Sequence, residues 1–138
     1  MAILGCDPGL TGGLALIRHD GSLVFAEAMP ILHGTVSVVD PRQVDHLLRA
    51  AEGAEVTAVV ERAQSFPGMG VSSSFNYGTA FGSLLGILGS LGIGIAFASP
   101  AKWKRDMGLD SSKRRSVDLA RQMYPKLVFP NGVRRGSE

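Results

Sequence analysis

The hydrophobic pattern of the chain begins with a short apolar run that ends in a carboxylate. Residues 2–6 are small or apolar and are followed at once by Asp7 and a Pro-Gly pair. Such a run is too short for a helix, and the turn formers after it predict a buried strand that meets solvent at Asp7. A second apolar run, residues 56–60, ends in Glu61 in the same way. If the two strands are neighbours, the two carboxylates converge, and a divalent cation such as magnesium is the usual means of relieving their repulsion.

Further apolar runs predict the rest of the sheet and a first helix. Residues 14–17 and 23–26 are separated by an Asp-Gly hairpin signal, so three antiparallel strands open the chain. Asp40 followed by Pro41 predicts the start of a helix that extends toward Gly53. The runs at 56–60 and 93–98 are continuously apolar, which is typical of interior parallel strands.

The segment 63–101 contains no Asp, Glu, Lys, Arg or His, so it must be tested as a membrane span. Repeated glycines interrupt its apolar run, and a polar stretch precedes that run; both features disfavour a span. We therefore expect no membrane association, but a buried helix from about Ser73 to Gly92 and then a buried strand.

Two faces of this central helix differ in character. Its expected apolar face consists of Phe81, Leu84, Leu85, Leu88 and Leu91. Another face carries a glycine row, which we define as Gly78, Gly82 and Gly86. Glycine in a helix interior costs about 1 kcal/mol relative to alanine, so the row requires an explanation. Packing against the sheet, a partner subunit or a nucleic-acid backbone would each provide one, and we expect packing against the sheet.

Positive charge is concentrated at the end of the chain. Residues 1–101 carry four Arg and no Lys against eight acids, a net charge of −4, whereas residues 102–138 carry ten Lys and Arg against four acids, a net charge of +6. A basic segment beside an acidic metal site suits a polyanion. The alternative is a solvated face.

A final helix is expected in this basic segment. It should begin after Gly108, with Asp110 or Ser111 as its cap, and end before Pro125. Its expected buried residues are Val117, Ala120 and Met123.

The first turn of the final helix carries three consecutive cations, Lys113, Arg114 and Arg115. Cations there oppose the helix dipole at a cost of about 0.3–1 kcal/mol each. The placement is explained if a phosphate binds at this end of the helix, and the alternative is that the long side chains simply extend into water.

Size and cysteine content limit the class of protein. A chain of 138 residues fits a single domain. The one cysteine, Cys6, cannot form an internal disulfide and is expected in the core. No charged-then-apolar signal segment precedes the first strand, so a reducing, cytoplasmic setting is expected.

Four motifs follow one another in a recognisable order. They are Asp7 in Gly-Cys-Asp-Pro-Gly, Glu61 in Val-Val-Glu-Arg-Ala-Gln, Pro-Ala-Lys-Trp-Lys ending at Lys104, and Gly-Leu-Asp-Ser-Ser-Lys ending at Lys113. Together they resemble RuvC-type Holliday junction resolvases, particularly phage-like members, over nearly the whole chain. The resemblance implies an α/β, ribonuclease H-like fold, with a mixed sheet of three antiparallel strands and then parallel strands, flanked by helices.

The resemblance also implies a function. It predicts a structure-selective DNA endonuclease, a crossover junction endodeoxyribonuclease of DNA recombination and repair. Such an enzyme binds four-way junctions as a homodimer, in a bacterial or phage-infected cell, and nicks paired strands with two magnesium ions, for which manganese substitutes.

The expected site residues follow from the matched motifs. Asp7 and Glu61 match the family's first two metal-binding acids, and Lys104 and Lys113 match its basic residues near the scissile and flanking phosphates; these four are the expected catalytic residues. Further expected DNA-binding cations are Lys102, Arg105, Arg114 and Arg115.

Two aromatic residues are candidates for contact with DNA bases. Phe66 and Phe75 flank a Pro-Gly-Met-Gly loop after Glu61, where the family carries an aromatic residue that stacks on junction bases. Stacking stabilises an unpaired base by about 1–3 kcal/mol. Phe66 is the stronger candidate, because the alternative for Phe75 is a place in the core at the helix start. Trp103 is expected to be a packing anchor for the basic segment.

The sequence departs from the family at its end. Family members carry a histidine or aspartate, and an aspartate three residues later, on a final helix, and no residue here matches those positions. We therefore expect the C-terminal catalytic helix to be missing and one face of the sheet to be exposed, with Glu138 as the one acid nearby. Two carboxylates under-ligand a two-metal site, so the alternative function is a non-catalytic junction- or DNA-binding module of the same fold.

The Asp7 turn also resembles the phosphate-binding hairpin of actin-like ATPases and sugar kinases. Those proteins hold the nucleotide between two lobes, and 138 residues do not provide the second lobe. We therefore expect no nucleotide cofactor.

Overall fold

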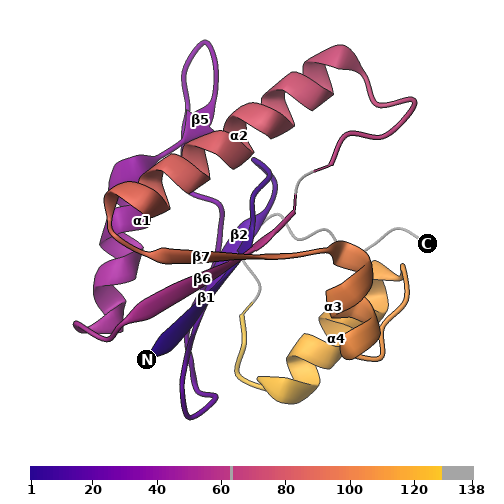
Figure 1. The fold of residues 1–138 in the computed structure, drawn as a ribbon. Coiled ribbons are helices and arrows are strands. Elements are labelled where there is room, and N and C mark those ends of the chain that lie inside the picture. Colours follow the sequence, from indigo (N-terminus) through magenta and orange to yellow (C-terminus); the bar gives the residue numbers. More distant parts are fainter. Residues whose placement is uncertain (63, 129–138) are drawn as a thin grey trace.

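A mixed five-stranded sheet is the centre of the structure (Figure 1), a computed structural model that describes residues 1–62 and 64–128. In spatial order its strands are β3 (Leu23–Ala28), β2 (Gly13–Arg18), β1 (Ala2–Asp7), β6 (Val56–Glu61) and β7 (Gly94–Ala98). Strand β2 is antiparallel to both β3 and β1, whereas β6 runs parallel to β1 and β7 runs parallel to β6. The expected mixed sheet is therefore confirmed.

Four helices flank this sheet. They are α1 (Pro41–Leu48), α2 (Val71–Ser90), α3 (Pro100–Asp106) and α4 (Lys113–Met123). Helix α2 lies across one face of the sheet, and α3 and α4 lie beyond the carboxyl ends of the strands (Figure 1). Three short elements were not expected: the pair of strands β4 (Ile31–Leu32) and β5 (Val38–Val39), and a 3-10 turn, η1 (Arg49–Ala51), after α1.

The core lies between the sheet and the helices α1 and α2. Leu4 and Leu16 are opposite one another on β1 and β2, and both are fully buried. Leu84 and Leu88 of α2 are fully buried in the same cluster, as is Val44 of α1. Burying each such side chain stabilises the fold by about 1.5–3 kcal/mol. The core thus fixes α2 firmly over β1 and β6.

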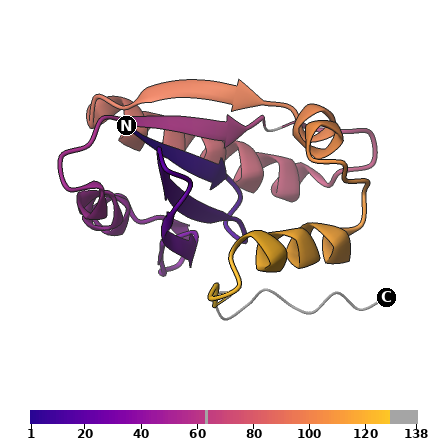
Figure 2. The same cartoon turned by 90° about the horizontal axis from the view of Figure 1, so that it is seen from below.

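The opposite face of the sheet is open. Ile3 points away from the core, opposite Ile17 on β2 and Thr57 on β6, and it is 37% exposed. Figure 2 shows this side of the sheet in front, with α2 behind the strands. The expected exposure of one sheet face is therefore seen in the described residues.

The uncharged middle of the chain forms α2, which begins at Val71, two residues before the expected start. Among the helices of residues 1–62 and 64–128, none is long and apolar enough to cross a membrane.

The glycine row of α2 does not pack against the sheet, so that expectation is wrong. Gly78, Gly82 and Gly86 are exposed, and a Cβ added at any of them would meet no other atom within 4 Å. The apolar residues between them supply the buried face, and the glycines fall on the outer side of the helix. A partner subunit or a nucleic-acid backbone remains as the explanation for the row.

Gly82→Ala is expected to raise the free energy of unfolding by about 0.5–1 kcal/mol, because alanine removes the entropy cost of a helical glycine and the added methyl meets nothing. Thermal or urea melts of dilute protein measure this. A loss of stability that is seen in concentrated protein and disappears on dilution would instead mean that another subunit packs closely on the row.

The final helix differs from expectation in two respects. Its cap is Ser112, whose hydroxyl accepts a hydrogen bond from the Arg115 backbone N–H, and neither Asp110 nor Ser111 takes that position. Asp110 instead accepts from the Ser112 N–H at 2.8 Å, which forms a turn ahead of the helix. Met123 is 51% exposed rather than buried, and no residue of α4 is fully buried.

Candidate functional site

Asp7 and Glu61 lie side by side at the carboxyl ends of two parallel strands. Cys6 of β1 is opposite Val60 of β6, so the residues that follow them occupy adjacent positions. Side chains alternate along a strand, and because Cys6 and Val60 point into the core, Asp7 and Glu61 both point to the open face. Asp7 is exposed and Glu61 half-buried. The expected convergence of the two acids is therefore found in the structure.

A tight turn fixes the backbone at Asp7. The Gly12 N–H donates to the Gly9 carbonyl at 2.9 Å, and Gly13 is then paired with Asp7 across β1 and β2. A Cβ at Gly12 would lie 2.1 Å from the carbonyl oxygen of Asp7 and 2.9 Å from its Cγ. Only glycine permits this approach, so the glycines after Asp7 are part of what positions its carboxylate.

The indole of Trp103 holds the side chain of Glu61. The Trp103 Nε1–H donates to Glu61 Oε2 at 2.7 Å, in a half-buried contact between α3 and β6. The backbone after Glu61 is also fixed, because the Arg62 N–H donates to the Ala98 carbonyl at 2.9 Å. Trp103 thus does anchor the basic segment, but through a polar bond to one of the two candidate metal ligands.

Tyr77 of α2 completes the surroundings of the two acids. Its ring packs on the turn after Asp7, since a Cβ at Gly9 would lie 3.3 Å from Tyr77 Cε2. Burial raises the pKa of the Tyr77 hydroxyl, and the negative charges of Asp7 and Glu61 raise it further. The phenol therefore stays protonated beside the carboxylates and is available as a hydrogen-bond donor.

The basic residues of α3 have different environments. Lys104 is half-buried, and its ammonium lies 5.6 Å from the centroid of the Trp103 ring, a cation–π arrangement. Lys102 is exposed and paired with Asp106, and this hydrogen bond is the main cause that lowers the pKa of Asp106. Arg105 is exposed. Of these three cations, Lys104 is the one that contacts Trp103, the residue bonded to Glu61.

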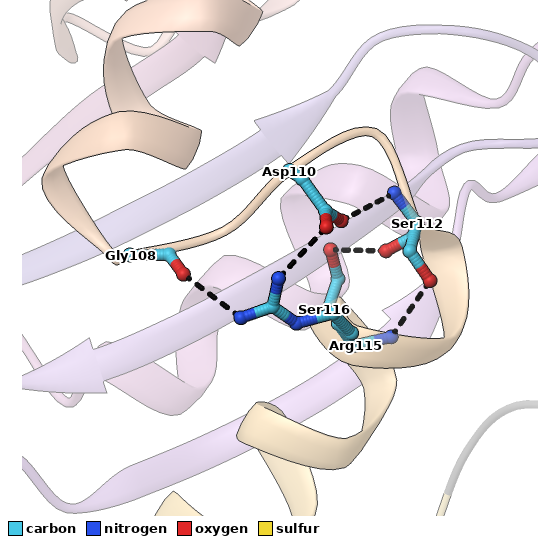
Figure 3. Close-up of polar contacts among 5 residues, drawn as sticks. All are labelled: Gly108, Asp110, Ser112, Arg115 and Ser116. Carbon is cyan, nitrogen blue, oxygen red and sulfur yellow. Dashed lines mark hydrogen bonds and ion pairs between the residues drawn. The ribbon is translucent and has the colours of Figure 1, made fainter.

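Arg115 is engaged by the loop between α3 and α4, as Figure 3 shows. Its guanidinium donates to Asp110 Oδ2 at 2.7 Å and to the Gly108 carbonyl at 3.3 Å. The Ser112 N–H first and then Arg115 lower the pKa of the Asp110 carboxyl. Arg115 thus holds the turn that leads into α4, a structural role that its sequence position did not indicate.

The other two cations of this turn face outward. Lys113 is the first residue of α4 and is exposed. Arg114 lies 3.9 Å from Asp118 in an exposed pair one turn along. Surface pairs of this kind contribute little to stability, about 0–1 kcal/mol.

Both candidate stacking residues are on the surface. Phe66 is 61% exposed in the loop after β6, and Phe75 is 72% exposed on the first turns of α2. The alternative in which Phe75 fills the core is therefore wrong. Each ring is exposed enough to stack on another aromatic ring.

Two carboxylates are the metal-ligating set that the structure offers. Within residues 1–62 and 64–128, no group of three or more His, Cys, Asp and Glu side chains is placed to hold a metal ion, and Glu138 lies outside the described residues. Cys6 is a core residue, as expected, and this burial raises the pKa of its thiol to about 12. Asp7 and Glu61 fit a hard divalent cation whose other ligands are water and phosphate oxygens.

Comparison with solved structures decides the fold. Thermus thermophilus RuvC in complex with a Holliday junction substrate matches with a TM-score of 0.60 and 21% sequence identity, over 91% of this chain and 80% of that one. A second Thermus thermophilus RuvC structure matches with a TM-score of 0.57 and 22% identity, over 91% of this chain and 81% of that one. The chain has the RuvC fold. No family model and no curated protein sequence matches it.

The RuvC fold was recognisable from the order of the motifs, but two neighbours of its acid pair were not. Tyr77 comes from a polar stretch at the start of α2, and nothing in that stretch indicated that its ring packs on the turn after Asp7. Trp103 stands inside the Pro-Ala-Lys-Trp-Lys motif beside Lys104, and that position was the one available signal. In this RuvC-fold chain an indole from α3 is therefore bonded to Glu61, and a phenol from α2 lies within the electrostatic influence of both acids.

Proposed function

We propose that this chain is a structure-selective endonuclease that binds four-way DNA junctions and nicks paired strands. The pairing of Asp7 with Glu61, at adjacent strand ends on the open face of a RuvC-fold sheet, is the observation that carries the proposal. The basic helices α3 and α4 beyond the same strand ends support it, since a phosphate backbone can reach cations and acids together.

Asp7 and Glu61 are the proposed ligands of magnesium, for which manganese would substitute. When bound between carboxylates and a phosphate, such ions activate water for attack on phosphorus and stabilise the leaving oxygen. The chain's own residues hold this site in place: the glycine turn fixes Asp7, and Trp103 orients Glu61. No side-chain nucleophile is required.

The remaining expected residues are proposed to bind DNA. Lys104 and Lys113 would contact phosphates near the cleaved bond, and Phe66, with Phe75 second, would stack on bases at the junction. We further propose a single-domain subunit that acts as a homodimer in the cytoplasm of a bacterial or phage-infected cell. The exposed glycine row of α2 supports a close contact with a second subunit or with DNA.

A labelled four-way junction tests the function directly. With magnesium, we expect nicks at paired positions on opposite strands of the junction and none on linear duplex of the same sequence. Equal cutting of both substrates would contradict the structure selectivity.

A non-catalytic junction-binding module is the second candidate. The specific observation in its favour is that the described residues provide two acids at the site and no third ligand. It predicts junction binding in calcium and in magnesium alike, with no nicking in either magnesium or manganese.

Lys113→Ala is expected to weaken junction binding and to lower the slope of log affinity against log salt by about 0.7–0.9, the release of about one counterion. Filter binding or anisotropy over a range of salt concentrations measures both quantities. Arg18→Ala is the matched control, because Arg18 is exposed at the opposite end of the sheet, opposite Ala2. An equal change of slope in the two variants would exclude Lys113 as a residue that contacts DNA phosphates.

A further inference from the structure

The hydrogen bond from Trp103 to Glu61 joins two parts of the molecule that do different things. Glu61 ends β6 and is a proposed metal ligand, whereas Trp103 lies on α3, between the DNA-facing cations Lys102 and Lys104. We propose that Trp103 is a positioning residue that orients Glu61 for metal and couples metal binding to the placement of α3 on DNA. The inference rests on the proposed function, because it concerns the same metal site.

The bond suits the task of orienting a carboxylate. An indole N–H is a donor only, so Trp103 cannot itself ligate a cation, and it engages one oxygen of Glu61 at 2.7 Å. A hydrogen bond to an ionised acceptor is about twice as strong as a neutral one. Trp103 therefore fixes the plane of the Glu61 carboxylate and leaves its second oxygen, Oε1, without a bond to the indole. Residues that hydrogen-bond to metal ligands orient those ligands in this way.

The same bond also joins helix α3 to the sheet. It starts at Pro100, directly after β7, and the Ser99 hydroxyl caps it by accepting from the Lys102 N–H. No residue of α3 is fully buried, and Trp103 is half-buried. The half-buried bond from Trp103 to Glu61 therefore joins a weakly packed helix to β6.

Lys104 extends the connection toward the substrate. Its ammonium lies over the Trp103 ring, 5.6 Å from the centroid, so cation, indole and carboxylate form a continuous series of contacts. A shift of Glu61 on metal binding would move Trp103 and, through it, the cation that meets the phosphate. Coupling of this kind is reciprocal: DNA bound at α3 would raise the metal affinity by the same factor as metal raises the DNA affinity.

The chain contains one tryptophan, so tryptophan emission reports on the surroundings of Trp103. We expect a saturable change in Trp103 emission when manganese or calcium is titrated into the protein without DNA. Glu61→Gln should change the emission of the metal-free protein and abolish the response to metal. Glu55→Gln changes an exposed acid directly before the same strand; it is the control and should leave both unchanged.

Trp103→Phe keeps an aromatic ring on α3 and removes the N–H. Calorimetric titration with manganese should show an affinity about 10–100-fold lower than that of the original chain, with the thermal melt nearly unchanged. Junction affinity should rise when calcium is added to the original chain, and this gain should be lost in Trp103→Phe. A structural role alone would lower junction affinity equally with and without calcium.

The outcomes separate the inference from the function on which it rests. If the original chain binds metal and junction and Trp103→Phe retains both the metal affinity and the calcium-dependent gain, the positioning role is wrong and the proposed function stands. If the original chain binds neither manganese nor a four-way junction, both fail.

Discussion

Asp7→Asn is expected to abolish nicking of a four-way junction while junction binding in calcium is largely retained. The substitution keeps the size of the side chain and removes the charge that would hold the cation beside Glu61. The loss should exceed the about 10²-fold that removal of an outer partner of a metal ligand causes. Single-turnover nicking and competition binding, carried out on the same preparations, measure the two quantities.

Two further variants make this result specific. Glu61→Gln should behave as Asp7→Asn does, because the two acids are adjacent on the open face. Glu55→Gln changes an exposed acid on the approach to β6 and should nick at the original rate. Unchanged nicking by Asp7→Asn would exclude Asp7 as a metal ligand, and loss of nicking in all three variants would point to a general effect of charge.

Gly12→Ala is expected to lower the free energy of unfolding by about 2–4 kcal/mol, in the range that overpacking and backbone strain produce. The new Cβ would lie 2.1 Å from the Asp7 carbonyl oxygen, and Gly12 itself is held in a turn closed by the hydrogen bond from its N–H to the Gly9 carbonyl. Since the backbone must shift to accept the methyl group, Asp7 should move with it, and nicking should fall along with stability. Urea unfolding and the junction assay measure the two effects.

Gly34→Ala is the matched control for this substitution. Gly34 is an exposed glycine in which a Cβ would be 3.6 Å from the Val36 carbonyl oxygen, an ordinary contact. This variant should change stability by less than about 1 kcal/mol and leave nicking unaltered. Equal stability of Gly12→Ala and Gly34→Ala would show that the Asp7 turn adapts, and the positioning role of Gly12 would be lost.

The features that sequence reasoning predicted well are those with a local cause. Both acid-bearing strands are short apolar runs that end in a carboxylate, and turn formers close the first of them, so their ends at Asp7 and Glu61 could be located without knowledge of the fold. Asp40 did cap α1, because its carboxylate and the proline after it define a helix start by themselves. The mixed sheet then followed from the order of these elements.

The features that sequence reasoning missed depend on tertiary placement. Helix α3 has seven residues, too few to show periodicity, and its cap Ser99 gave the one local signal. The bond between Trp103 and Glu61 spans 42 positions of the chain. The glycine row was expected to face the sheet, but the larger side chains of α2 took that side because they bury more apolar surface.

The last helix shows how a local signal can also mislead. Asp110, Ser111 and Ser112 are all of types that favour helix caps, and the sequence pattern pointed to the first two rather than to Ser112. Asp110 is committed to the turn through the Ser112 N–H and Arg115, so the helix starts at the next available hydroxyl. The same bonds engage Arg115, which sequence reasoning had grouped with the DNA-facing cations.

Competition binding in calcium tests the central claim most directly. A labelled four-way junction is bound by the chain, and unlabelled junction or linear duplex of the same sequence is added; calcium keeps cleavage from complicating the result. We expect the junction to compete at least about tenfold better than the duplex, a difference of about 1.4 kcal/mol in binding free energy. Equal competition by the two DNAs, or no binding of either, would contradict it.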